Sequence, residues 1–278
     1  MRWPPFEHIF FDCDSTLTKV EGIDVLAEAM GKRQRVELLT QAAMEGMIGL
    51  EEVYAKRLRT LRPTRQQVLD TRHSYKRNIV EDTAIVVSAL QSLGHKVYII
   101  SGGLAEPVEE FGVSLGIPRV QIRAVGITYN ELSGQWWEKS ETDDIRYMTY
   151  TDGALTISDG KAQIVRELLG TQRGRSLLIG DGMSDLLAGE AVDLFVGFGG
   201  VVSRPKVKEK APVFIESASM APLLGLAGGP AELRILSKWS MQYQSLSLKA
   251  QYLIQKGAVI FNHEHLESRF QQAFFSTP

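Results

Sequence analysis

The chain has very little cysteine: Cys13 is the single one among 278 residues. An intramolecular disulfide is therefore excluded, and the fold must depend on packing and bound ligands rather than on cross-links. The N-terminus also lacks the apolar core of a secretory signal, because residues 1–8 include two prolines, a Glu and a His. Both observations predict a protein of the reducing cytoplasm.

Long hydrophobic runs and an excess of one charge are missing too. The strongest apolar stretches, residues 97–100 and 176–179, have the length of a strand, whereas a membrane-spanning helix needs roughly 20 apolar residues. The 31 basic and 33 acidic residues give a formal net charge of -2, so no global field attracts nucleic acid or anionic lipid. We expect neither nucleic acid nor a membrane as a partner.

Short apolar runs separated by helix-like segments are the main positive signal. With 44% hydrophobic residues, the chain can bury a substantial core. The alternation predicts an α/β fold with a doubly wound parallel sheet, in which ligands bind beyond the carboxyl ends of the strands. The expected strands are residues 9–11, 97–100, 177–179, 194–196 and 213–215.

The segment between the first two strands is longer than one crossover helix requires. Helical patterns cover residues 23–30, 33–47, 50–61 and 65–74. We interpret them as a small helical cap over the site; the alternative is a set of extra helices on the sheet edge. Less regular residues 121–160 predict a β-hairpin or flap.

A boundary is expected at residues 227–230, beyond which apolar residues recur every three or four positions, as on one helix face. That face predicts packing on the protein's own body or, alternatively, a homodimer through the C-terminal helix. His263 and His265 are interpreted as solvated tail residues. We thus divide the chain into a core of residues 1–17 and 78–225, a cap of 18–77 and a C-terminal helical extension of 226–278.

Two carboxylates, Asp12 and Asp14, follow the first expected strand. One aspartate can attack phosphorus and form an acyl phosphate, while a second, protonated one can donate to the leaving oxygen and later accept a proton from water. The alternative is a turn with capping aspartates.

Three further motifs lie where strands end or helices begin. Ser101-Gly102-Gly103 offers a hydroxyl and accessible N–H groups for a phosphate, although the same residues could form an ordinary glycine turn. Lys161 could neutralise the reacting groups or be an exposed lysine at a helix start. Asp181 and Asp185 would complete, with Asp12, an all-oxygen site for Mg²⁺, or simply form a tight strand-to-helix turn.

Together, in this order, these motifs resemble the haloacid dehalogenase superfamily of phosphotransferases. Further stretches resemble the phosphoserine phosphatases within it, and the resemblance covers about residues 9–216. The stretches are Glu21-Gly22-Ile23-Asp24, Ala43-Met44, Arg57-Leu58, and Gly197-Phe198-Gly199-Gly200 with Arg204.

The resemblance implies a magnesium-dependent hydrolase that takes L-phosphoserine to L-serine and phosphate, a step of serine biosynthesis. The alternatives are a phosphatase for another small phosphorylated metabolite and a non-catalytic protein that binds phospho-ligands. The resemblance implies that Asp12 is the nucleophile and Asp14 the general acid and base, and that Asp12, Asp181 and the Asp14 backbone carbonyl bind Mg²⁺ with support from Asp185. It places Glu21 at the substrate ammonium, Arg57 at the substrate carboxylate and Met44 in the pocket wall. The residues implied at the phosphate are Ser101, Gly102, Gly103, Lys161 and Ser184.

The sequence departs from the phosphoserine phosphatase pattern in several places. The segment 136–160 is longer than expected, and the residues after Gly228 have no counterpart in a minimal member. Leu50 stands where some members have an aromatic residue, and Ser184 where they have Asn or Thr. The type of reaction is thus better determined than the substrate.

Overall fold

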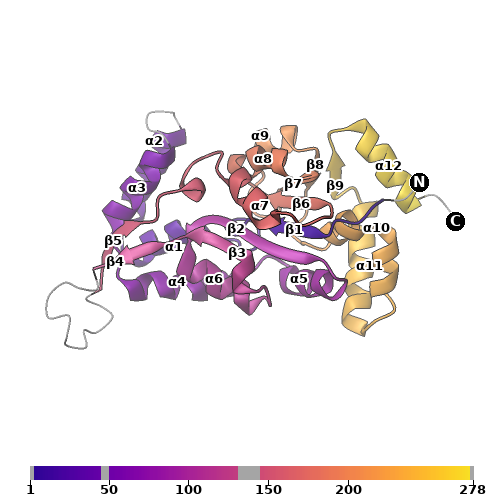
Figure 1. Ribbon diagram of the computed structural model, residues 1–278, viewed down its shortest axis with the longest axis horizontal. Helices are drawn as coiled ribbons and strands as arrows, with labels where there is room; N and C mark the ends of the chain where they lie inside the picture. The colour runs from indigo at the N-terminus through magenta and orange to yellow at the C-terminus, as the bar shows by residue number, and fades with distance from the viewer. Residues whose placement is uncertain (1–2, 45–49, 131–144, 276–278) are drawn as a thin grey trace.

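The computed structural model describes residues 3–44, 50–130 and 145–275, with the side chains of residues 40–44 and 50 left aside. Its centre is a seven-stranded sheet in the order β3-β2-β1-β6-β7-β8-β9 (Figure 1). All neighbouring strands are parallel except β9, which runs antiparallel to β8. The strands are β1 (His8–Phe11), β2 (Lys96–Leu104), β3 (Ile122–Val125), β6 (Ser176–Gly180), β7 (Leu194–Phe198), β8 (Val213–Ile215) and β9 (Val259–Phe261).

Alternating side chains of the central strand β1 build two separate cores, as expected for a strand buried on both faces. Ile9 and Phe11 belong to the larger apolar cluster, while Phe10 belongs to the other cluster and stacks on Tyr98 of β2. All five expected strands are present, so the doubly wound α/β prediction is confirmed. The small edge strands β3 and β9 were not expected.

Helices cover both faces of the sheet (Figure 1). On the face of the larger cluster lie α5 (Thr83–Ser92), α6 (Ala105–Ser114) and α10 (Pro222–Leu236). The other face carries α7 (Lys161–Leu169), α8 (Met183–Ala188) and α9 (Pro205–Lys210). Short 3-10 turns occupy Arg119–Gln121, Ala154–Thr156 and Gly189–Ala191.

The long insertion after β1 is helical, as predicted. It contains α1 (Gly22–Ala29), α2 (Arg33–Met44), α3 (Leu50–Leu61) and α4 (Arg65–Arg77); residues 45–47 of the expected second helix lie outside the described part of the chain. These helices have their own apolar cluster, which includes Leu26, Leu58 and Val68. Tyr147 of the neighbouring ribbon also belongs to it.

A two-stranded antiparallel ribbon lies beside these helices, within the region expected to form a hairpin or flap. Its strands are β4 (Ile127–Tyr129) and β5 (Tyr147–Tyr150), and residues 131–144 between them lie outside the described residues. Figure 1 shows the ribbon next to α1 and α3, at the end of the molecule remote from the C-terminus.

The prediction of one continuous C-terminal helix face is wrong. The chain turns at residues 237–240, so α10 ends at Leu236 and a separate α11 (Met241–Gln255) begins after Ser240, which is extended (φ -72°, ψ 160°). The boundary expected at 227–230 is a kink inside α10, where Gly229 has a φ of 71°, a value that favours glycine. The chain then forms β9 and α12 (Glu264–Phe275).

The C-terminal elements pack on the body of the protein, which was the first of the two interpretations. Leu246 and Ala250 of α11 are buried in the larger cluster, and the Tyr243 hydroxyl lies 2.8 Å from Ser88 Oγ of α5. The division into core, cap and extension stays a prediction. No helix among the described residues is long and apolar enough to cross a membrane.

Candidate active site

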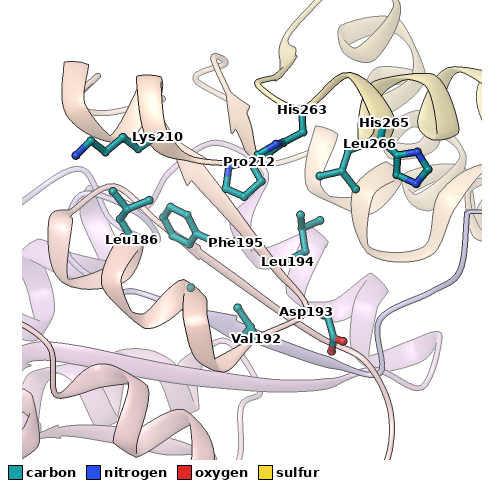
Figure 2. Close-up of a pocket in the computed structure, with 11 residues that line it drawn as sticks. Leu186, Val192, Asp193, Leu194, Phe195, Lys210, Pro212, His263, His265 and Leu266 are labelled. Carbon is teal, nitrogen blue, oxygen red and sulfur yellow. The ribbon is translucent and has the colours of Figure 1, made fainter.

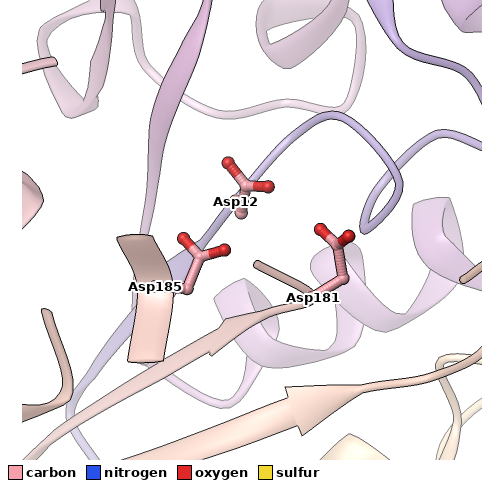
Figure 3. Close-up of side chains that lie close together, drawn as sticks. All are labelled: Asp12, Asp181 and Asp185. Atoms are coloured by element: carbon pink, nitrogen blue, oxygen red, sulfur yellow. The ribbon is translucent and has the colours of Figure 1, made fainter. Parts of the chain in front are cut away.

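The ends of two adjacent parallel strands bring Asp12 and Asp181 together. Asp12 follows β1, and its N–H donates to the carbonyl of Ile179 in β6 at 2.9 Å; Asp181 follows β6 directly. Asp185 reaches the same place from the first turn of α8 (Figure 3). The three carboxylates are buried, and one oxygen of each lies within 4.8 Å of the others.

Lys161 is the cation built into this cluster. It begins α7, is 5% exposed, and donates from Nζ to Oδ1 of Asp12 and to Oδ1 of Asp185, each at 2.6 Å. Burial lowers its pKa, but the two carboxylates outweigh that effect and raise it overall. Lys161 therefore stays charged and holds Asp12 in place.

The carboxylates still repel one another despite Lys161. Burial and the Asp185 charge raise the pKa of Asp12 well above its usual value. The same two causes raise the pKa of Asp181 to about 6, although Arg204 donates to its Oδ2 at 2.8 Å. Buried carboxylate oxygens under this repulsion form the hard donor set that divalent magnesium prefers, so the residues fit Mg²⁺.

The Asp14 side chain contacts α1 rather than that cluster. Its side chain is not among the three clustered carboxylates; the expected metal contact was its backbone carbonyl. Oδ2 of Asp14 accepts from the N–H of Gly22 in α1 at 2.9 Å. Burial, followed by the nearby Glu21 charge, raises the pKa of Asp14 to about 7. This carboxyl can hold a proton near neutral pH, as a general acid must.

Glu21, the residue before α1, is tied to the core from two directions. Ser15, in the left-handed region at φ 56°, donates from Oγ to Glu21 Oε1 at 2.8 Å. Nη2 of Arg204 lies 3.7 Å from the same oxygen. Arg204 thus links the residue before α1 to Asp181 in the carboxylate cluster, a contact that the sequence did not predict.

The strand β2 does not end at Ile100 but continues through Ser101, Gly102 and Gly103 to Leu104. The pairing with β3 shifts register between Ile100 and Leu104. Ser101, Gly102 and Gly103 therefore lie in an irregular part of the strand rather than beyond its end. The buried Ser101 hydroxyl accepts from the Gly103 N–H at 2.9 Å.

The remaining residues expected at the site are Arg57, Ser184 and Met44. Arg57 is half-buried on α3; burial lowers its pKa, while the charges of Asp24 and Glu21 raise it. Arg57 therefore lies within electrostatic reach of Glu21. Ser184 is half-buried in the first turn of α8. Met44 ends α2, but its side chain lies outside the described residues.

A separate cavity of about 520 Å³ lies at the other end of β7, among residues from α8, β7 and the chain around α12 (Figure 2). Leu194, Phe195 and Leu266 give it an apolar wall, while His263 and His265 are exposed at its edge. Asp193, also in its lining, accepts from the N–H of Ser176 at 2.7 Å. None of the residues that line this cavity belongs to the carboxylate cluster.

Comparison with known proteins agrees with this geometry. Residues 9–190 match the model of haloacid dehalogenase-like hydrolases. The chain belongs to the haloacid dehalogenase-like hydrolase family. The matched region contains Asp12, Lys161 and Asp181, whereas the C-terminal α10, α11 and α12 lie beyond it.

Individual relatives of this hydrolase are phosphoserine phosphatases. The protein of that name from Drosophila melanogaster is 34% identical over 209 residues, which cover 74% of this chain and 73% of that protein. The Homo sapiens phosphoserine phosphatase is 30% identical over 208 residues, covering 74% and 88%. A solved structure of a phosphoserine phosphohydrolase-like protein from Francisella tularensis superposes with a TM-score of 0.63 at 25% identity, over 79% of this chain and 99% of that one.

Two tyrosines near Asp14 could not be predicted from the sequence. Tyr54 on α3 and Tyr75 on α4 both have buried hydroxyls, and the Asp14 charge contributes to raising the pKa of each after burial. Tyr75 lies one residue past the predicted end of its helix, and nothing in the local pattern distinguishes either ring from a core aromatic residue.

Proposed function

We propose that this phosphatase of the haloacid dehalogenase-like hydrolase family removes phosphate from L-phosphoserine through an aspartyl-phosphate on Asp12. The observation that carries the proposal is the buried cluster of Asp12, Asp181 and Asp185 with Lys161 bonded to two of them. A module that only bound phosphate would gain nothing from negative charges at this point, because they repel the ligand.

The first step of the proposed reaction is in-line attack by the Asp12 carboxylate on phosphorus. The bond from phosphorus to the ester oxygen breaks, and Asp14 gives its proton to that oxygen, so that serine leaves as the alcohol. In the second step Asp14 takes a proton from water, which hydrolyses the acyl phosphate and restores Asp12.

Charge placement supplies the catalysis. Ser101, the N–H groups near Gly102 and Gly103, and the Lys161 ammonium would hold the phosphoryl oxygens. When bound by Asp12, Asp181 and the Asp14 carbonyl, with Asp185 in support, Mg²⁺ would supply further positive charge for the transferring group. Ser184, next to Asp185, would complete the phosphate site.

The cap would recognise the amino-acid part of the substrate. Glu21 offers a carboxylate for the ammonium, and Arg57 offers a guanidinium whose fork matches a carboxylate. Met44 would line the pocket. A second candidate function, hydrolysis of another small phosphomonoester, is favoured by the Arg204 contact, since Glu21 already has a cationic neighbour.

The test is phosphate release from L-phosphoserine, phosphoethanolamine, phosphoglycerate and sugar phosphates, with Mg²⁺ and with chelator. Arg57→Met should raise KM for phosphoserine about tenfold or more and leave phosphoethanolamine, which has no carboxylate, nearly unchanged. Arg59→Met, on an exposed residue of the same helix, is the matched control.

Each result has a separate meaning. Preference for phosphoserine that Arg57→Met removes supports the substrate. Metal-dependent turnover of another ester keeps the reaction and rejects the substrate, while no turnover of any ester rejects the reaction as well.

The compartment and the partners of the enzyme also follow from its expected role. We place it in the cytoplasm, with no nucleic-acid or membrane partner, and we propose a homodimer through α11. Met241, Leu248 and Tyr252 lie on this helix with 82%, 59% and 57% exposure. Leu248→Glu should convert the dimer to monomer in sedimentation velocity; a monomeric wild type would reject this arrangement.

A further inference from the structure

The Tyr75 hydroxyl is buried at the junction of the cap and the core. Tyr75 lies in the last turns of α4, is fully buried, and its ring contacts Phe111 of α6 edge-on at 5.7 Å between ring centres. A Cβ on Gly22 would lie 2.1 Å from the phenol oxygen, and one on Gly103 would lie 3.4 Å from it. The hydroxyl therefore lies in space that is left open by the missing side chains of Gly22 in α1 and Gly103 in β2.

The polar neighbour of this hydroxyl is Asp14. Burial raises the pKa of the Tyr75 hydroxyl, and the Asp14 charge raises it further, so the phenol keeps its proton. Within the described residues, the Tyr75 hydroxyl and Oδ1 of Asp14 are both buried and neither has another hydrogen-bond partner, while the contact between the two side chains lowers the pKa of Asp14 and raises that of Tyr75. Because a buried polar group without any hydrogen bond costs free energy, the two groups are expected to pair with each other.

We propose that Tyr75 is a positioning residue that donates a hydrogen bond to the Asp14 carboxylate as this residue gives up its proton to the leaving oxygen. The inference rests on the proposed function. The Gly22 N–H already fixes Oδ2 of Asp14, and the phenol adds a second donor beside the buried Oδ1. Tyr75 itself neither gains nor loses a proton.

The Tyr75 phenol is expected to matter in the step in which Asp14 protonates the leaving oxygen. Before transfer, Asp14 is a neutral carboxylic acid and needs little stabilisation. As its proton moves to the serine oxygen, negative charge develops on Asp14 in a buried place, where a hydrogen bond to a charged group is worth more than one to a neutral group. When the leaving group departs without a proton, Asp14 keeps its own proton in this step. No negative charge then develops on Asp14, and the step should not need Tyr75.

The experiment compares two substrates of the same shape. The serine of L-phosphoserine needs a proton on its oxygen in order to leave, whereas the cysteine of S-phospho-L-cysteine can leave as a thiolate, whose conjugate acid has a pKa near 8.5. Tyr75→Phe should lower kcat/KM for phosphoserine about tenfold or more and that for S-phosphocysteine less than about twofold. The control is Tyr98→Phe, which removes another buried tyrosine hydroxyl, one that contacts His8 at 3.3 Å.

Tyr98→Phe should leave the ratio of the two kcat/KM values unchanged. An equal fall for both substrates in Tyr75→Phe, no fall for either, or a variant that does not fold would overturn the role of Tyr75. Those results are distinguishable from failure of the proposed function, in which the wild-type enzyme itself would release phosphate from neither substrate and both proposals would fall.

Discussion

At the scale of single residues, Lys161 has the clearest consequence. It is the buried cation bonded to both Asp12 and Asp185, so its loss leaves two carboxylates facing the incoming phosphate. We expect Lys161→Met to lower kcat about 100-fold or more, as removal of a preorganised charge does elsewhere. Lys206→Met, on an exposed residue of α9, serves as the control in the same steady-state assay. Equal kcat in the two variants would contradict this role.

Asp14 gives a prediction about pH and stability. Its pKa is raised from 3.8 to about 7 in the fold, first by burial. A raised pKa means that its contribution to stability is complete below about pH 4 and is lost as the pH rises to about 7. Asp14→Asn lacks this loss and should be more stable than the wild type at pH 8 by at least about 1 kcal/mol, with no gain at pH 4.

Chemical unfolding at the two pH values measures the difference. A gain of equal size at both would show that amide packing, not the charge, is responsible. The same variant should have lost phosphatase activity, so that stability and function oppose each other at this carboxyl.

Residue types and their positions could be predicted where the chemistry leaves few choices. Asp12, Lys161, Asp181 and Asp185 were expected together, and the structure brings their side chains together. The roles of Arg204 and Tyr75 could not be predicted in this way. Their contacts depend on how α4 and the chain before α9 meet the end of β1, and no local spacing encodes that.

At the scale of elements, one ion pair fastens α10 to the start of β2. His95 Nε2 lies 2.7 Å from Glu232 Oε2, and Nδ1 lies 2.5 Å from the carbonyl of Phe6. Both partners accept hydrogen bonds, so a doubly protonated imidazole satisfies both. Burial lowers the pKa of His95, but Glu232 outweighs it and the pKa is raised above 6.5.

This pair should make stability fall as the pH rises. Its contribution is complete below about pH 6.5 and is lost as the pH passes the raised pKa of His95. Glu232→Gln should cost about 1–3 kcal/mol of unfolding free energy at pH 6 and less at pH 9, measured by urea unfolding. Glu264→Gln, exposed on α12, is the control; a cost that does not change with pH would reject a charged His95.

Elements with a strong apolar run were predictable, and elements whose limits depend on tertiary contacts were not. The strands β1 and β6 were placed nearly to the residue, because each is buried on both faces. The strand β9 has three half-buried residues and exists because it pairs with the edge of β8. Likewise, a periodic pattern crosses residues 237–240 without a break, and only the packing of α11 against α5 reveals the turn.

At the scale of the whole molecule, the C-terminal segment is part of the body rather than an appendage. Phe270 of α12 is 2% exposed and meets Trp3 edge-on at 5.0 Å between ring centres, so it joins the two ends of the chain. We expect Phe270→Ala to cost about 3 kcal/mol or more of unfolding free energy. Phe275→Ala, at a position 52% exposed, should cost far less. Similar urea midpoints for both variants would contradict a shared core.

Charged groups also connect the helices inserted after β1 to the central sheet. Arg204 bonds Asp181 in the cluster and lies 3.7 Å from Glu21, the residue before α1, while Asp14 accepts from the N–H of Gly22 in α1. In the proposed function, a substrate held by Glu21 would therefore meet groups that already contact the carboxylate cluster. This arrangement lets recognition of the substrate and its chemistry depend on the same few contacts.

Phosphorylation of Asp12 during turnover can be measured directly. Acid quenching during turnover of L-phosphoserine with Mg²⁺, followed by proteolysis and mass spectrometry, should find one phosphoryl group on the peptide that contains Asp12. Hydroxylamine should remove it, as expected of an acyl phosphate, and Asp12→Asn should not acquire it. Turnover of phosphoserine without any phosphoryl group on this peptide, or undiminished turnover by Asp12→Asn, would contradict the account.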